Sequence, residues 1–86
     1  MKLPSALELQ NAVLFVMQKK GSSMHFKEIE LLVAQHLSLN EDQLNIRRSG
    51  NRTEFAYRLS WARTALSHQK KIIRKEKGFW NLYVNE

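Results

Sequence analysis

The sequence predicts a single α+β domain, mainly α, in which three helices precede a C-terminal β-hairpin. Apolar residues recur at helical spacing in three segments, and a Gly-containing turn separates two extended runs near the C-terminus. The chain has 86 residues, so it is expected to form one domain over residues 1–86 with a small hydrophobic core.

The first helix is expected from about Ser5 to Lys19. Ser5 and Glu8 have the spacing of a capping box, in which each side chain accepts a hydrogen bond from a backbone amide of the other. Gly21 is a helix stop signal. The apolar residues that share one face of this helix are Leu9, Ala12, Val13, Val16 and Met17.

The middle of the chain predicts shorter elements. A short strand is expected near residues 24–26, followed by a second helix over about 27–37. Asn40 is expected to cap a short turn, and the polar residues 47–52 are expected to form a loop. The apolar stripe of the second helix is Phe26, Ile29, Leu32, Val33 and Leu37.

The third helix is expected from near Thr53 to Gln69 or Lys70. After it, the β-branched run 72–74 and the aromatic run 79–84 flank a turn, which is typical of a hairpin. Both tryptophans are expected to pack in or beside the core. The residues that form or widen the core face of the helix are Phe55, Leu59, Trp61, Ala62, Ala65 and Leu66.

This order of elements is that of a winged helix-turn-helix. In such folds the last helix enters the major groove of DNA, and the hairpin is the wing that lies along the backbone. The charge distribution favours the same partner. Residues 47–77 hold ten Lys or Arg and two acidic residues, whereas residues 1–46 hold four Lys or Arg and five acidic residues. A basic second half indicates a polyanionic partner, here double-stranded DNA, although a merely basic surface is the alternative.

The flank of the third helix opposite its core carries small side chains and one long guanidinium. Small residues let a helix approach a groove floor, an arginine can bind guanine with two hydrogen bonds, and hydroxyls can reach phosphates. The alternative is an ordinary solvated face. The residues expected to face bases and nearby backbone are Thr53, Tyr57, Ser60, Arg63 and Thr64.

Basic residues on either side of this helix are expected to hold phosphates. They are Arg47, Arg48 and Arg52 before the helix, and Lys75 and Lys77 at the hairpin tip. The alternatives are a basic loop and solubilising edge charge. Arg58 is expected to form an ion pair with Glu54 rather than to contact DNA.

Leu7 and Leu14 are expected on the far side of the first helix from its core face. Two exposed leucines two turns apart are candidates for a homodimer contact or for docking a partner domain. The alternative is that they are scattered surface leucines.

The sequence excludes several classes of site. It has no cysteine and therefore no disulfide or thiolate metal site, and its longest apolar run, residues 12–17, is too short to cross a membrane. His25, His36 and His68 lack the spacing of a metal pair, and no Gly-rich phosphate loop occurs. We expect no catalytic site, no metal, no cofactor and a cytoplasmic location.

Two motifs resemble those of a known family. The stretch from Arg58 to Leu66, RLSWARTAL, and residues 77–82, KGFWNL, are similar to the N-terminal domain of Mrr-type restriction proteins. In that family an R-x-x-W-A-R-x-x-L helix leads into a hairpin that ends G-x-W-x-[LIV]. The start at Leu3-Pro4 and residues 26–29 also look similar, so the resemblance covers nearly the whole chain.

The resemblance implies a winged helix that presents DNA to a separate nuclease domain. No nuclease motif is present in these 86 residues, so cleavage is not expected of this chain. Three functions stay open: the DNA-recognition module of a restriction-type system, a stand-alone DNA binder like a transcription regulator, and a winged helix that binds another protein.

Overall fold

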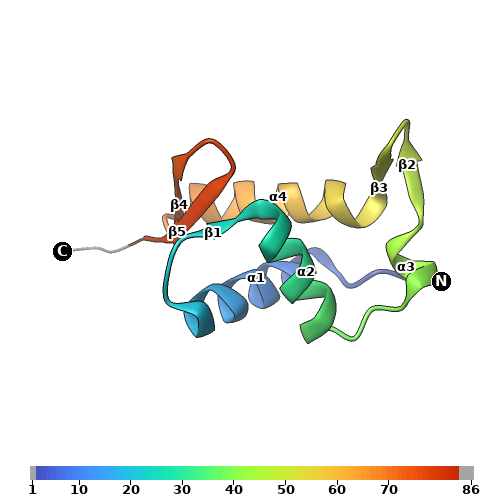
Figure 1. Ribbon diagram of the computed structural model, residues 1–86, viewed down its shortest axis with the longest axis horizontal. Helices are drawn as coiled ribbons and strands as arrows, with labels where there is room; N and C mark the ends of the chain where they lie inside the picture. The colour runs from blue at the N-terminus through green and yellow to red at the C-terminus, as the bar shows by residue number, and fades with distance from the viewer. Residues whose placement is uncertain (1, 84–86) are drawn as a thin grey trace.

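The computed structural model describes residues 2–83 and shows a small α+β fold that is mostly helical (Figure 1). The predicted fold class is confirmed at that level. Val84, which was placed in the last extended run, lies outside the described residues. The elements are α1 (Ala6–Lys20), β1 (Met24–His25), α2 (Phe26–His36), α3 (Glu41–Leu44), β2 (Arg47–Ser49), β3 (Arg52–Thr53), α4 (Glu54–His68), β4 (Ile72–Glu76) and β5 (Phe79–Leu82).

Helix α1 begins and ends where its sequence signals predict. The Glu8 backbone N–H donates to Ser5 Oγ at 3.2 Å, and the Ser5 backbone N–H donates to Glu8 Oε1 at 2.9 Å. Gly21 adopts φ +72°, and its N–H donates to the Met17 carbonyl at 2.9 Å. All five apolar residues predicted for its core face are buried.

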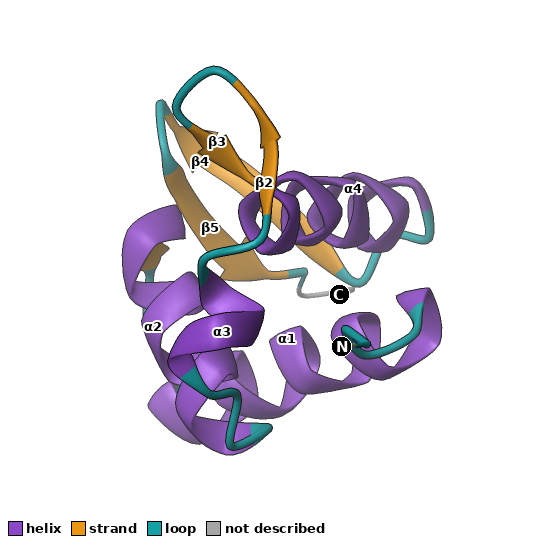
Figure 2. Ribbon diagram, turned by 90° about the vertical axis from the view of Figure 1, so that its right-hand side faces the viewer, coloured by secondary structure: helices purple, strands orange, loops and turns teal. Residues whose placement is uncertain are grey.

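The core lies where α1, α2 and α4 meet. Helix α1 contacts α2, α4 and β5, and Figures 1 and 2 show it running beneath α4. Helix α4 buries Phe55, Leu59, Ala62 and Leu66, as its periodicity predicts. Met24, Ile29, Val33, Ala34 and Ile72 complete a single cluster of buried side chains. This core fixes α4 along most of its length and leaves one flank of that helix uncovered by α1.

The predicted C-terminal hairpin is present, and β1 joins it to form a three-stranded antiparallel sheet. The strand order is β1-β5-β4, with Met24 opposite Trp80 and Ile72 opposite Leu82. The Phe26 N–H donates to the Gly78 carbonyl at 2.8 Å, so the start of α2 is tied to the turn of the β4–β5 hairpin.

A second hairpin stands where the sequence predicts a loop. Strands β2 and β3 pair antiparallel, with Arg47 opposite Thr53, and Arg47 Nη1 donates to the Gly50 carbonyl at 2.9 Å. All three residues of β2 are exposed, so the strand has no buried face. The expected turn after Asn40 is the short helix α3, which is closed by a capping box between Asn40 and Gln43.

Candidate nucleic-acid interface

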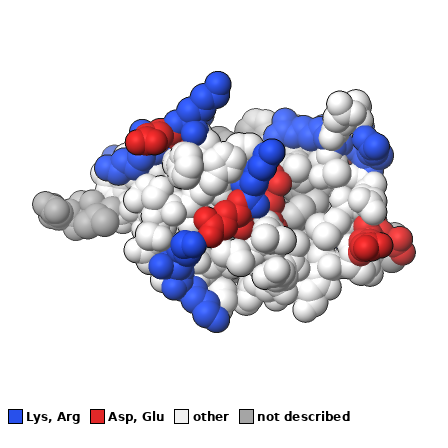
Figure 3. Space-filling view, viewed as in Figure 1, with Lys and Arg blue, Asp and Glu red and all other residues white. Residues whose placement is uncertain are grey.

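The two hairpins rise on the same side of the molecule at opposite ends of α4. Figure 1 shows β2–β3 beside the start of α4 and β4–β5 beside its end, and Figure 2 shows both projecting above the helices. In Figure 3 Lys and Arg side chains lie near the outer ends of both hairpins, with an acidic side chain among them on one hairpin and an uncharged tip on the other. Helix α4 therefore has a basic hairpin at each end.

Tyr57 anchors the β2–β3 hairpin to α4. The Arg48 guanidinium lies over the Tyr57 ring, with Cζ 3.5 Å from the ring centroid, and Arg52 Cζ lies 5.5 Å from it. Arg47, Arg48 and Arg52 are all exposed. Cation–π contacts of this kind hold arginine side chains in place while their N–H groups can still meet an anion.

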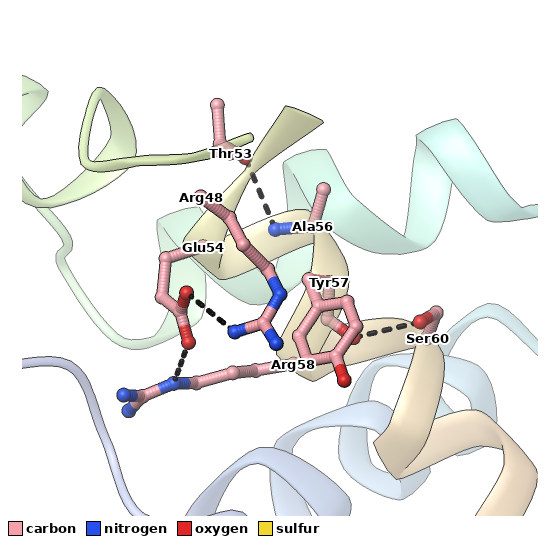
Figure 4. A network of polar contacts seen from close by, with 7 residues as sticks. All are labelled: Arg48, Thr53, Glu54, Ala56, Tyr57, Arg58 and Ser60. Carbon is pink, nitrogen blue, oxygen red and sulfur yellow. Dashed lines mark hydrogen bonds and ion pairs between the residues drawn. The ribbon is translucent and has the colours of Figure 1, made fainter. Parts of the chain in front are cut away.

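Glu54, the first residue of α4, forms one ion pair with Arg48 of the β2–β3 hairpin and a second with Arg58 of α4 (Figure 4). Arg58 Nε donates to Glu54 Oε2 at 2.7 Å, and Arg48 Nη1 donates to Glu54 Oε1 at 3.2 Å. The Arg58 bond, with a smaller effect of Arg48, holds the pKa of the Glu54 carboxyl below its ordinary value. The predicted Arg58–Glu54 ion pair is confirmed, and Glu54 neutralises part of the charge of Arg48.

The hydroxyl groups predicted to face DNA lie on a half-buried flank of α4. Thr53 caps the helix, its Oγ1 accepting from the Ala56 N–H at 3.1 Å. Ser60 Oγ donates to the Tyr57 carbonyl at 2.7 Å, and Thr64 Oγ1 donates to the Ser60 carbonyl at 3.0 Å. These contacts are local, and each hydroxyl oxygen keeps capacity to accept a hydrogen bond from a ligand.

Arg63 is not on that flank. It was expected opposite the core, but its side chain is buried, with 7% of its surface exposed. At about 100° per residue, Arg63 lies only about 80° around the helix from Phe55, and this side of α4 is covered by α2 and the β4–β5 hairpin. Burial lowers the pKa of Arg63, and the negative charge of Glu30 offsets part of that effect.

The β4–β5 hairpin carries its cations at the tip. Arg74, Lys75 and Lys77 are exposed, and Glu76 lies between them. A bulge between Arg74 and Glu76 interrupts the register opposite Phe79. Bulges increase local twist and redirect side chains, which here affects a charged tip rather than a buried strand.

Two expectations about apolar residues were wrong. Trp61 was expected in or beside the core and is 58% exposed, since at about 100° per residue it lies about 120° around α4 from Phe55. Trp80 packs against the core as expected. Leu14 was expected to be exposed beside Leu7, but it packs against the core, while Leu7 is 65% exposed. The pair of exposed leucines suggested for a homodimer or partner-domain contact is therefore absent.

Two of the three histidines have capping or packing contacts. His25 Nδ1 accepts from the Lys27 N–H at 3.1 Å, and the His36 ring stacks on Phe15 with centroids 4.2 Å apart. Over residues 2–83, no group of three or more His, Asp or Glu side chains is placed to hold a metal ion. None of the helices in that range is both long and apolar enough to cross a membrane.

Sequence reasoning missed the β2–β3 hairpin and the position of Arg63. The turn Ser49-Gly50-Asn51 between two arginines was the available signal for the hairpin, since Gly-Asn is a typical hairpin turn pair. The position of Arg63 depends on which elements cover α4, and helical spacing alone does not give that.

Comparison with known proteins adds a family. The model of the family described as Mrr N-terminal domain matches residues 7–83, nearly the whole chain. Of the curated proteins and the solved structures compared with the chain, none matches.

Proposed function

Because this chain belongs to the Mrr N-terminal domain family, we propose that it is a winged-helix module that binds double-stranded DNA in a restriction-type system. In this proposal α4 is the recognition helix and the β4–β5 hairpin is the wing. The element order α1, β1, α2, α4, β4, β5 supports it, since a winged helix has this order. DNA binding in a restriction-type system also favours a cytoplasmic location.

One observation carries the proposal: basic hairpins flank α4 on the same side of the molecule (Figures 1 and 3). The major groove is about 12 Å wide and admits one α-helix, so α4 could enter it while the cationic hairpins at its two ends reach the phosphate backbones. The proposed phosphate contacts are Arg47, Arg48, Arg52, Lys75 and Lys77. Thr53, Tyr57, Ser60 and Thr64 would lie nearest the groove.

The module is proposed to have no catalytic activity of its own. The sequence motifs of a nuclease are missing from these 86 residues, and strand cleavage would then depend on a separate nuclease domain. A catalytic domain encoded downstream in the same reading frame would support the restriction role. A stand-alone DNA binder is the alternative if no such domain is encoded.

Titration of a fluorescent random-sequence duplex tests DNA binding. We expect binding at low salt that weakens steeply as salt rises, with a slope of about −0.9 for each phosphate contact. Lys77→Ala should flatten that slope by about 1 on every sequence. Lys19→Ala, which removes the same charge from α1 and not from either hairpin, is the matched control. No salt-dependent binding by the wild type would contradict the proposal.

A second candidate function is docking of a protein partner. It is favoured by the exposed Trp61, which borders an apolar hollow of about 470 Å³ between α1 and α4. A partner on this face would leave both basic hairpins free. The same titration separates the two functions, because a module that binds only protein would show no salt-dependent affinity for random duplex.

A further inference from the structure

A basic hollow of about 310 Å³ opens between α2, α4 and the two hairpins. Its lining combines cations and aromatic rings from α2, β3, α4, β4, β5 and the β4–β5 turn, and none of the lining residues is acidic. We call it the basic hollow. It is lined by Phe26, Arg52, Arg63, Arg74, Lys77, Gly78 and Trp80.

Arg63 forms the inner wall of the basic hollow and lacks hydrogen-bond partners there. Its Nε and Nη1 atoms are buried, and no residue of the described chain accepts a hydrogen bond from either. Its guanidinium lies between two rings, with Cζ 5.5 Å from the Phe26 centroid and 5.9 Å from the Trp80 centroid. A buried guanidinium with free N–H groups is costly unless something pairs with it.

Among the described residues, Glu30 is the one acidic side chain whose charge affects the pKa of Arg63. Glu30 is half-buried and forms no ion pair with Arg63 within 4.0 Å. Burial raises the pKa of Glu30, and the charge of Arg63 only partly opposes that rise. One carboxylate outside the lining leaves the basic hollow strongly positive, since four cations line it.

We propose that the basic hollow holds one phosphate group, bound by Arg63 on the inside and by Arg52, Arg74 and Lys77 at the rim. Guanidinium groups match phosphate oxygens with paired, charge-assisted hydrogen bonds, and this chemistry would satisfy the free Nε and Nη1 atoms of Arg63. The natural source of this group is a single phosphodiester of the DNA backbone, an assignment that rests on the proposed function. Inorganic phosphate is the probe for the site itself.

The experiment uses a Trp61→Phe background, in which Trp80 is the remaining tryptophan. Inorganic phosphate is titrated at constant ionic strength against chloride, and a random-sequence duplex is titrated separately. The readouts are Trp80 fluorescence and the Arg63 Nε–H signal in the ¹H–¹⁵N spectrum. We expect phosphate and duplex to shift the Arg63 signal, and chloride to leave it in place.

Variants connect the response to the basic hollow. Arg63→Met removes the charge and keeps an apolar side chain between the rings, so the Trp80 response to phosphate should be lost. Its DNA salt slope should flatten by about 0.9, the value for one phosphate contact. Lys77→Ala should weaken phosphate binding severalfold, whereas Lys75→Ala, an equal charge change on the same hairpin outside the lining, should not.

The outcomes separate this proposal from the proposed function. If duplex binds but neither ligand shifts the Arg63 signal, the phosphate site is wrong and DNA binding stands. If phosphate shifts the signal while duplex fails to bind, the phosphate site stands and the proposed function fails. If Arg63→Met does not fold, equal phosphate affinities for Lys77→Ala and Lys75→Ala would overturn the site.

Discussion

At the scale of single residues, Gly78 combines an unusual backbone angle with a crowded position. It adopts φ +83°, and a Cβ built there would lie 3.0 Å from His25 Nε2 and 3.5 Å from Phe26 Cδ1. We expect Gly78→Ala to destabilise the fold by about 1–3 kcal/mol, since a non-Gly residue in this region is strained and the neighbours must shift. Urea denaturation of the wild type and the variant measures this change in the free energy of unfolding.

Gly50→Ala is the matched control for that substitution. Gly50 adopts φ +54° and would have no atom within 4 Å of an added Cβ, so it isolates the backbone cost. Equal losses of stability in the two variants would show that the His25 and Phe26 side chains move away from the added methyl group at no cost in free energy.

Glu30 makes the stability of the fold depend on pH. Burial raises the pKa of its carboxyl above the ordinary value of 4.5, so the ionised form is disfavoured in the folded state. Glu30→Gln should therefore have a higher melting temperature than the wild type at pH 7. That advantage should shrink as pH falls through the raised pKa toward 4.5, below which the wild-type carboxyl is protonated in both folded and unfolded chains.

Thermal melts of both proteins between pH 3 and pH 8 check this. Glu76→Gln, on the exposed hairpin tip, controls for the change in net charge. A wild type that is more stable than Glu30→Gln at pH 7 would mean that the attraction between Glu30 and Arg63 outweighs the burial of the carboxylate.

Individual residues show why part of the site could be predicted from sequence. The Arg58–Glu54 ion pair follows from the i,i+4 spacing on one helix, which local geometry fixes. The burial of Arg63 and the exposure of Trp61 do not, because they depend on how far α1, α2 and the β4–β5 hairpin extend over α4. Periodicity gives the centre of a buried face, and the packing partners determine its edges.

At the scale of elements, α1 depends on its capping box. Ser5→Ala removes the side-chain acceptor for the Glu8 N–H and should cost about 1 kcal/mol. For a domain of this size that corresponds to a fall in melting temperature of about 4–8 °C. Ser22→Ala, an exposed position in the bend after α1, should leave the melting temperature nearly unchanged.

Elements were predictable where their residues carry apolar patterns. The three long helices repeat apolar residues at helical spacing, and the β4–β5 hairpin has an apolar run on each side of a Gly-containing turn; all are present. The β2–β3 hairpin has no buried face in β2 and is held instead by Gly50, the Arg47 side chain and the stacking of Arg48 on Tyr57. Such contacts leave no hydrophobic period in the sequence.

At the scale of the whole molecule, the two hairpins should contribute independently to DNA binding. We expect Arg47→Ala with Arg48→Ala, and Lys75→Ala with Lys77→Ala, each to flatten the salt slope by about 2, since no phosphate is shared between the two pairs. Because the hairpins lie at opposite ends of α4, the free-energy losses should add in the fourfold variant within about 0.5 kcal/mol. A fourfold variant no weaker than one double variant would mean that only one hairpin meets DNA.

The distance between the hairpins sets the footprint of one copy. Helix α4 has 15 residues, which corresponds to a length of about 22 Å. One turn of duplex is about 34 Å, so a monomer whose phosphate contacts are spaced by the length of α4 covers less than a full turn. A duplex of about ten base pairs would then bind one copy of the protein, and a longer duplex would bind further copies in proportion to its length.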